Sequence, residues 1–100
     1  MKRDAAIAVL RQHAPEFREL GVVSLSLFGS TARDEATDLS DIDVAVCLER
    51  IEGGFAYFGR LADIERRLRR ILNARVDVVP EPAPKPGMQK AIEQDRIVAF

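Results

Sequence analysis

The most constraining feature of this 100-residue chain is a stretch over residues 55–73 whose apolar side chains recur at helical spacing. They are spaced four, three, four and three residues apart, which predicts one apolar stripe along an amphipathic helix: Tyr57, Leu61, Ile64, Leu68 and Ile71. Acid–arginine pairs at the i,i+4 spacing favour the same helix: Asp63–Arg67 and Glu65–Arg69. A helix with a single apolar face packs against a neighbouring layer of structure.

Segments typical of β-strands surround this helix. Residues 22–28 alternate, with Val23, Leu25 and Leu27 expected on one face, and residues 42–48 and 75–79 are rich in Val and Ile. Further helices are expected near residues 4–20, interrupted at Pro15, and at about 87–95, with a helical turn at 31–35 and a last strand at 96–99. The order predicts one α/β (α+β) domain over residues 1–100, a small mixed sheet with helices packed on it.

Composition excludes several classes of protein. The chain is 47% hydrophobic and 31% charged, unlike a disordered or collagen-like sequence. Apolar runs reach only about five residues, so we expect no membrane span, and the N-terminal segment carries charge where a signal peptide would be apolar. We therefore expect a cytoplasmic protein. The net charge of −1 predicts no direct binding to nucleic acid or membrane.

Two carboxylates stand at the start of the second predicted strand. Asp41 and Asp43 are two residues apart, so the strand period places both on one face, while Ile42 and Val44 point to the other. Neighbouring carboxylates raise each other's pKa, and a bound divalent cation would remove that penalty. Such pairs are usually solvated surface, but Asp is disfavoured in an otherwise apolar strand, which favours a cation site.

A Gly-Ser turn lies twelve residues upstream of this pair. Gly29 would allow the backbone close to a ligand, and Ser30 offers a hydroxyl and an N–H, so the turn is a candidate phosphate seat. It is not a Walker A loop, because the Gly-Lys-Ser/Thr ending is missing. Asp77, within the short Val-rich strand at 75–79, is a third candidate; a strand-end cap or an arginine partner is the alternative.

The three segments together resemble the signature of nucleotidyltransferases with a DNA polymerase β-type core. They are Gly29-Ser30-Thr31-Ala32-Arg33, then Ser40-Asp41-Ile42-Asp43-Val44, then Val76-Asp77-Val78-Val79. In length and element order the chain resembles the minimal nucleotidyltransferase (MNT) group across nearly its whole length. Two positions differ from the family pattern: Asp34 stands where Gly is frequent, and Leu39 where a polar residue is frequent. We expect Asp34 to alter the turn and to add negative charge near the phosphates.

The resemblance implies a role for each motif residue. Asp41, Asp43 and Asp77 would be the catalytic carboxylates and hold two Mg²⁺ ions, with Asp77 also accepting the proton of the attacking hydroxyl. The resemblance also implies a set of nucleotide-binding residues: Gly29, Ser30, Arg33 and Ser40. For Arg33, bracing the loop that carries Asp41 is an alternative role. The implied reaction is displacement at the α-phosphorus of ATP with release of pyrophosphate.

The MNT group also implies a partner. Its members are antitoxins paired with a helical HEPN ribonuclease toxin, to which they attach AMP at a tyrosine, as a homodimer or hetero-oligomer. Two alternatives remain open from the sequence: an antitoxin that acts by binding alone, and an enzyme that adenylylates a small hydroxylated molecule, as antibiotic nucleotidyltransferases do. The absence of an acceptor-binding domain argues against the second alternative.

Two further groups receive structural interpretations. Phe55, Tyr57 and Phe58 are expected to pack in the core, with a partner-binding or base-stacking surface as the alternative. Glu93 and Asp95 are interpreted as exposed helix charges.

Overall fold

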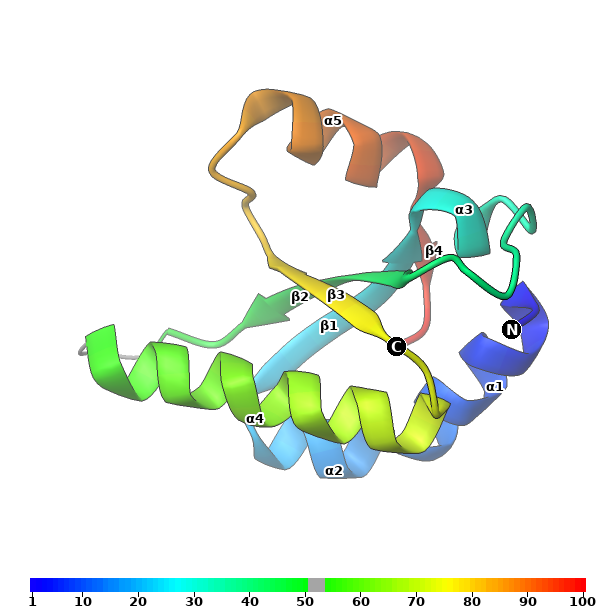
Figure 1. Cartoon of the computed structure of the whole chain (residues 1–100). Coiled ribbons are helices and arrows are strands. Elements are labelled where there is room, and N and C mark those ends of the chain that lie inside the picture. Colours follow the sequence, from blue (N-terminus) through cyan, green and yellow to red (C-terminus); the bar gives the residue numbers. More distant parts are fainter. Residues whose placement is uncertain (51–53) are drawn as a thin grey trace.

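A four-stranded sheet forms the centre of the computed structural model, which describes residues 1–50 and 54–100 (Figure 1). The helices and strands follow one another along the chain in this order: α1 (Arg3–Gln12), α2 (Ala14–Glu19), β1 (Val22–Phe28), α3 (Gly29–Ala32), β2 (Ile42–Leu48), α4 (Gly54–Leu72), β3 (Val76–Pro80), α5 (Pro86–Asp95) and β4 (Ile97–Val98). Within these residues, no helix has the length and apolar character needed to cross a membrane.

The sheet is mixed, as the sequence predicts. Its strand order is β3-β2-β1-β4. β1 pairs antiparallel with β2 and with β4, whereas β2 pairs parallel with β3. A parallel pair needs a long crossover connection, and α4 supplies it. The α/β architecture expected from the sequence is therefore confirmed.

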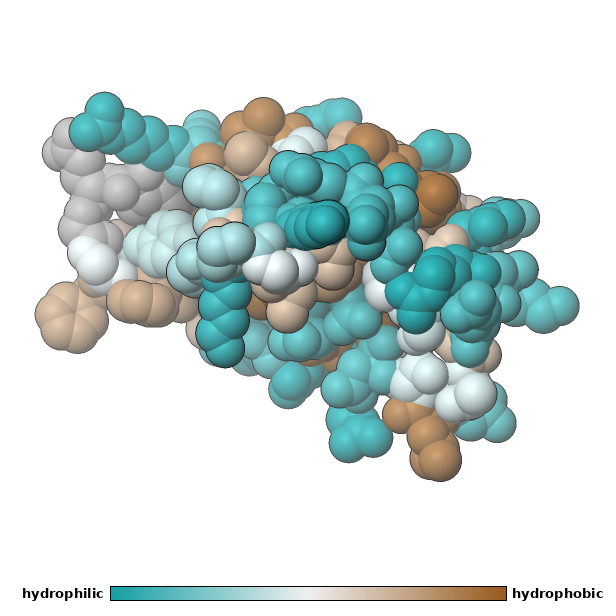
Figure 2. All heavy atoms as spheres, turned by 90° about the horizontal axis from the view of Figure 1, so that it is seen from above, coloured by the Kyte–Doolittle hydropathy of each residue, from teal (hydrophilic) through white to brown (hydrophobic). Residues whose placement is uncertain are grey.

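Most of the buried apolar side chains lie on one face of the sheet. There α1, α2 and α4 cover the side chains of β1, β2 and β3, with Leu10, Phe17, Ile64 and Leu68 fully buried (Figure 1). The opposite face carries α5 and a small cluster made by Phe28, Ala45 and Ile92. Figure 2 looks onto this second face and shows a mostly hydrophilic surface with apolar patches near its margins.

Element boundaries agree with the expected ones to within about two residues, except at two places. The helical turn predicted at 31–35 begins earlier, at Gly29, and the terminal strand is two residues long rather than four. Within β1, the predicted face of Val23 is wrong, because Val23 is 61% exposed. The pairing register shifts between Val22 and Ser24, and this bulge turns Val23 outward.

The expectation that the aromatic side chains of α4 pack in the core is also wrong. Phe55 is 98% exposed and Phe58 is 68% exposed, while Tyr57 is half-buried and meets Phe58 edge to face at 5.6 Å. The part of α4 that packs against the core lies further along the helix, where Ile64 and Leu68 are fully buried. The first turn of α4 therefore presents its aromatic rings to solvent.

Candidate active site

The Gly-Ser turn lies directly against the first carboxylate of β2. Phe28, the last residue of β1, pairs with Asp43, so the chain leaves β1 beside that side chain. Gly29 has a φ of +70°, and a Cβ at this position would collide with the Asp43 carboxylate. Glycine is required here both by its backbone conformation and by the space available.

Asp77 is the register partner of Asp43 across the parallel pair of β2 and β3. Neighbouring strands lie about 4.8 Å apart, so partners in register present their side chains side by side on one face. The apolar neighbours Ile42, Val44 and Val76 point into the main core on the other face. Asp43 is half-buried and Asp77 is exposed, which leaves the pair accessible from the face that carries α5.

Asp41 lies just before β2 and is exposed to solvent. Its carboxylate oxygen Oδ1 lies 3.4 Å from Nε of Arg75, the residue that precedes β3. Both side chains are more than half exposed, so this ion pair contributes little to stability. The ion pair links the beginnings of the two strands that carry Asp43 and Asp77.

The electrostatics of the site disfavour the ionised form of Asp43. Burial raises the pKa of the Asp43 carboxyl, and the carboxylates of Asp77 and Asp41 raise it further. The Arg33 guanidinium acts in the opposite direction. Negative charge is therefore concentrated at this point of the sheet, where Arg33 opposes it at Asp43 and Arg75 is paired with Asp41.

The side chains at this point fit a divalent cation by their chemistry. In residues 1–50 and 54–100, no three His, Cys, Asp or Glu side chains stand together closely enough to hold an ion as they are arranged. Burial, followed by the carboxylates of Asp77 and Asp41, nevertheless raises the pKa of Asp43, and a bound cation would favour its ionised form. Carboxylates are the ligands typical of Mg²⁺, and Asp41, Asp43 and Asp77 are the residues that could hold it.

Arg33 ends the short helix α3 and is bound by two carboxylates. Its Nε donates to Glu35 at 3.1 Å, and its Nη1 donates to Asp95 at 2.6 Å. Asp95 is only 20% exposed, so the expectation of an exposed helix charge is wrong for this residue. Sequence reasoning missed this contact because it joins residues 62 positions apart; the one local signal is a carboxylate at a helix C-terminus, where the helix dipole disfavours it.

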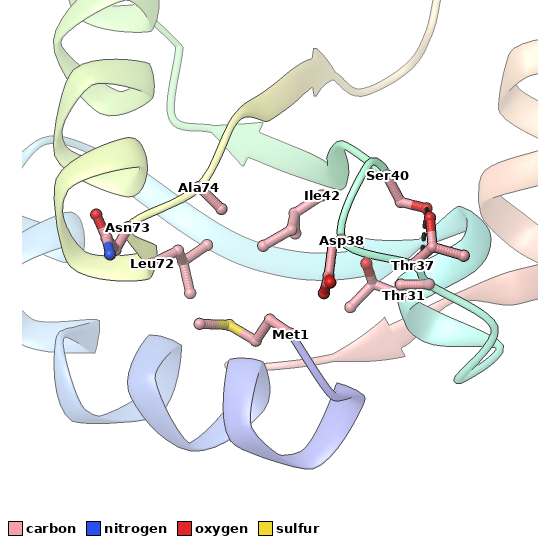
Figure 3. A pocket seen from close by; sticks show the side chains of 10 residues that line it. Met1, Thr31, Thr37, Asp38, Ser40, Ile42, Leu72, Asn73 and Ala74 are labelled. Atoms are coloured by element: carbon pink, nitrogen blue, oxygen red, sulfur yellow. Dashed lines mark hydrogen bonds between the residues drawn. The ribbon is translucent and has the colours of Figure 1, made fainter.

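Ser30 and Ser40 occupy different surroundings. Ser30 is half-buried on the turn next to Asp43, and its carbonyl accepts a hydrogen bond from the Glu35 N–H at 2.9 Å. The Ser40 hydroxyl accepts a hydrogen bond from the Thr37 N–H at 3.0 Å and lies beside the Thr37 hydroxyl (Figure 3). Ser30 thus follows Gly29 on the turn that contacts Asp43, whereas the Ser40 hydroxyl is engaged within its own loop.

A cavity of about 310 Å³ lies behind the loop that carries Ser40 (Figure 3). Apolar side chains of the main core, Ile42 and Leu72, form one wall, and Asp38 stands at the loop side. Thr31, also in the lining, is 1% exposed, and its hydroxyl has no hydrogen-bond partner among the described residues.

Asp34 has a left-handed backbone conformation, with φ at +61°. Its carboxylate accepts a hydrogen bond from the Arg3 N–H at 3.3 Å, at the first residue of α1. A carboxylate at a helix N-terminus is favourable for the helix dipole. The Asp34 carboxylate is thus directed towards α1, and its backbone adopts the left-handed conformation that glycine adopts freely.

This arrangement, a glycine turn pressed against a strand carboxylate with a second carboxylate in register, defines the class of the protein. The chain matches the family described as nucleotidyltransferase domain over residues 10–99. It belongs to that family, and its enzyme class is nucleotidyltransferase.

Similar proteins sharpen this assignment. The protein adenylyltransferase MntA of Thermococcus cleftensis is 34% identical over 86 residues, covering 85% of this chain and 83% of that protein. A Methanocaldococcus jannaschii protein, provisionally named a protein adenylyltransferase, is 35% identical over 91 residues, covering 89% of each chain. A solved structure provisionally named a minimal nucleotidyltransferase superposes with a TM-score of 0.72 at 29% identity, covering 97% of this chain and 95% of that one. The expected resemblance to the MNT group is confirmed.

Proposed function

We propose that this chain is the antitoxin of a HEPN/MNT pair and transfers AMP from ATP to a tyrosine hydroxyl of its toxin, in a reaction that depends on Mg²⁺. The observation that carries the proposal is the contact of the Gly29 turn with Asp43, with Asp77 beside it in register. That contact brings a candidate phosphate seat and two carboxylates together on one accessible face. An enzyme that cleaves a triphosphate needs both at one point.

The nucleotide-binding groups in this proposal are Gly29, Ser30, Arg33 and Ser40. Gly29 allows the phosphates close to the backbone, and Ser30, the next residue on the same turn, offers its hydroxyl and N–H. Arg33 supplies positive charge near the site, as its influence on the pKa of Asp43 indicates. Ser40 is one residue from Asp41, and its hydroxyl would have to leave Thr37, or share its contacts, to reach the nucleotide.

The proposed chemistry is an in-line displacement at the α-phosphorus. The acceptor oxygen forms a bond to that phosphorus, the bond to the bridging oxygen of the β-phosphate breaks, and pyrophosphate leaves with the electron pair. Asp77 is exposed beside Asp43 and would take the hydroxyl proton. Mg²⁺ held by Asp41, Asp43 and Asp77 would supply charge stabilisation for the attacking and leaving oxygens.

The proposed partner follows from solved structures that share this fold. One structure with this fold, a tri-AMPylated Shewanella oneidensis HEPN toxin in complex with its MNT antitoxin, has a TM-score of 0.62 at 16% identity. Another, a toxin–antitoxin with AMP-PNP, has a TM-score of 0.65 at 20% identity. A hetero-oligomer in the cytoplasm, where ATP is abundant, is the corresponding proposal here.

The test is co-expression of the chain with the product of a neighbouring HEPN-type gene, followed by intact-mass spectrometry of the toxin. We expect added AMP units on a tyrosine, formed only with ATP and Mg²⁺. The units should disappear when Asp41 and Asp43 are both replaced by Asn, because the remaining carboxylate cannot hold the metal and the phosphates in place.

The alternatives give different results in the same experiment. If the double Asn variant neutralises the toxin as well as the wild type does, and neither form of the chain adds mass to the toxin, the chain is an antitoxin that acts by binding alone. Transfer of AMP to small hydroxylated molecules but not to the toxin would identify a small-molecule adenylyltransferase.

A further inference from the structure

The helix that carries the candidate phosphate seat is too short to hold its own position. α3 has four residues, and an isolated helical turn of that length is unstable in water because few hydrogen bonds offset the ordering of its backbone. Its orientation therefore depends on contacts with other elements. Arg33, the residue that ends α3, makes such a contact with α5.

Asp95 holds the Arg33 guanidinium from a well-supported position. It is the last residue of α5, three positions after Ile92, and so lies on the same side of the helix as that fully buried side chain. The next residue, Arg96, donates to Glu81 at 2.8 Å and to the Ser26 hydroxyl at 3.4 Å, which attaches the end of α5 to the sheet. Asp95 is thus flanked by two anchored residues.

The contact leaves part of the guanidinium available. Hydrogen bonds occupy Nε and Nη1 of Arg33, while Nη2 forms none with any side chain in the described part of the chain. The Arg33 side chain is 45% exposed. An arginine fixed on one edge keeps its remaining N–H groups in a defined direction, which reduces the entropy lost when it binds an anion.

We propose that Asp95 is a positioning residue that fixes the Arg33 guanidinium for the phosphates of the nucleotide. The proposal rests on the proposed function, since it concerns the same site. A carboxylate at the C-terminus of a helix is unfavourable for that helix, and the contact with Arg33 offsets this cost. Glu35, the second partner of Arg33, is 65% exposed and is only two residues away, so it adds little orientation of its own.

The test compares Asp95→Asn with the matched variant Glu93→Gln, which removes a carboxylate from the same helix without touching Arg33. The measurements are KM and kcat for ATP in the transfer reaction, and the affinity for a non-hydrolysable ATP analogue by calorimetry. For Asp95→Asn we expect KM and Kd to rise roughly three- to tenfold with kcat nearly unchanged. Glu93→Gln should match the wild type in all three quantities.

A double-variant cycle separates positioning from a purely structural role. In the background of Arg33→Ala, adding Asp95→Asn should change the analogue affinity no further, since there is no guanidinium left to position. Additive losses, or an unchanged affinity in Asp95→Asn alone, would overturn the inference while leaving the proposed function intact. A wild-type chain that binds no analogue and transfers no AMP would overturn both.

Discussion

Different interactions hold the helices against the two faces of the sheet. On one face, α1, α2 and α4 bury a continuous set of apolar side chains. On the other, a small cluster around Ile92 is supplemented by ion pairs, Arg96 with Glu81 and Arg33 with Asp95. The first face supplies most of the hydrophobic stabilisation, and the second can therefore tolerate the crowding of charge around Asp43.

The largest expected effect is the loss of transfer in Asp43→Asn, by roughly a thousandfold or more, comparable with loss of a member of a catalytic set. Its stability at pH 7 should be equal to or higher than that of the wild type. The pKa of Asp43 is raised in the folded state by burial and by the nearby carboxylates. Protonating it therefore favours folding at low pH, and that contribution is lost as the pH rises through the folded-state pKa.

Rate measurements together with urea unfolding at pH 5 and pH 7 check this prediction. The advantage of the Asn variant over the wild type should be larger at pH 7 than at pH 5. A fully active Asp43→Asn would remove Asp43 from the site, and a strongly destabilised one would contradict the proposed division between the two faces.

The covered face should respond in the opposite way. Leu68 is fully buried in α4, so Leu68→Ala should lower the free energy of unfolding by about 2–5 kcal/mol through lost burial and a cavity. Transfer activity per folded molecule should stay close to that of the wild type. Val23→Ala, at an exposed position of β1, is the control and should change stability by less than about 0.5 kcal/mol.

A smaller effect is expected at the ion pair that attaches α5. Hydrogen bonds from Arg96 hold the pKa of Glu81 below its ordinary value of 4.5, and Glu81 is 12% exposed. Glu81→Gln should therefore lower the free energy of unfolding by about 1–2 kcal/mol at pH 7. The wild-type contribution is present above the unfolded-state pKa and is lost as the pH falls through the lowered folded-state pKa.

The difference between wild type and Glu81→Gln, measured by urea unfolding, should accordingly shrink below about pH 4.5. If wild type and Glu81→Gln differ in free energy of unfolding by the same amount at pH 7 and pH 3, packing rather than charge accounts for the stabilisation by Glu81. The cooperative loss of α5 alone, seen by hydrogen exchange, would show that this face unfolds separately from the other.

The smallest effect is expected at the start of α4. Phe55 is 98% exposed, so Phe55→Ser should change the free energy of unfolding by less than about 0.5 kcal/mol. Thermal or urea unfolding measures this directly. A loss above about 1 kcal/mol would mean that the ring is buried in solution, as the sequence interpretation held.

The sequence predicted what depends on local periodicity. The bounds of β1 and β2 follow from spacing within one segment, as do the apolar stripe of α4 from Leu61 to Ile71 and the pairs Asp63–Arg67 and Glu65–Arg69. The grouping of Gly29, Asp43 and Asp77 came instead from the family resemblance, and the roles of these residues remain predictions. Periodicity alone does not bring distant segments together.

What the sequence did not predict depends on contacts between distant segments. The outward position of Val23 follows from a register shift against β2, which no pattern within β1 reveals. The partner of Asp95 is Arg33, and this contact exists only because the fold brings α5 beside α3. The exposure of Phe55 likewise depends on where along α4 the core ends, and the identity of an apolar residue does not reveal that point.

The parallel register of Asp43 and Asp77 has a consequence for how such chains can change in length. Side chains alternate between faces, so deleting Val76, the residue of β3 that precedes Asp77, would turn Asp77 towards the apolar core and bring Val78 out beside Asp43. Pro84 and Lys85, the exposed residues just before α5, lie outside both strands, so a change of length there leaves the register of the two aspartates unchanged. Natural variation in length should therefore collect in such connections, while the spacing within the two strands stays fixed.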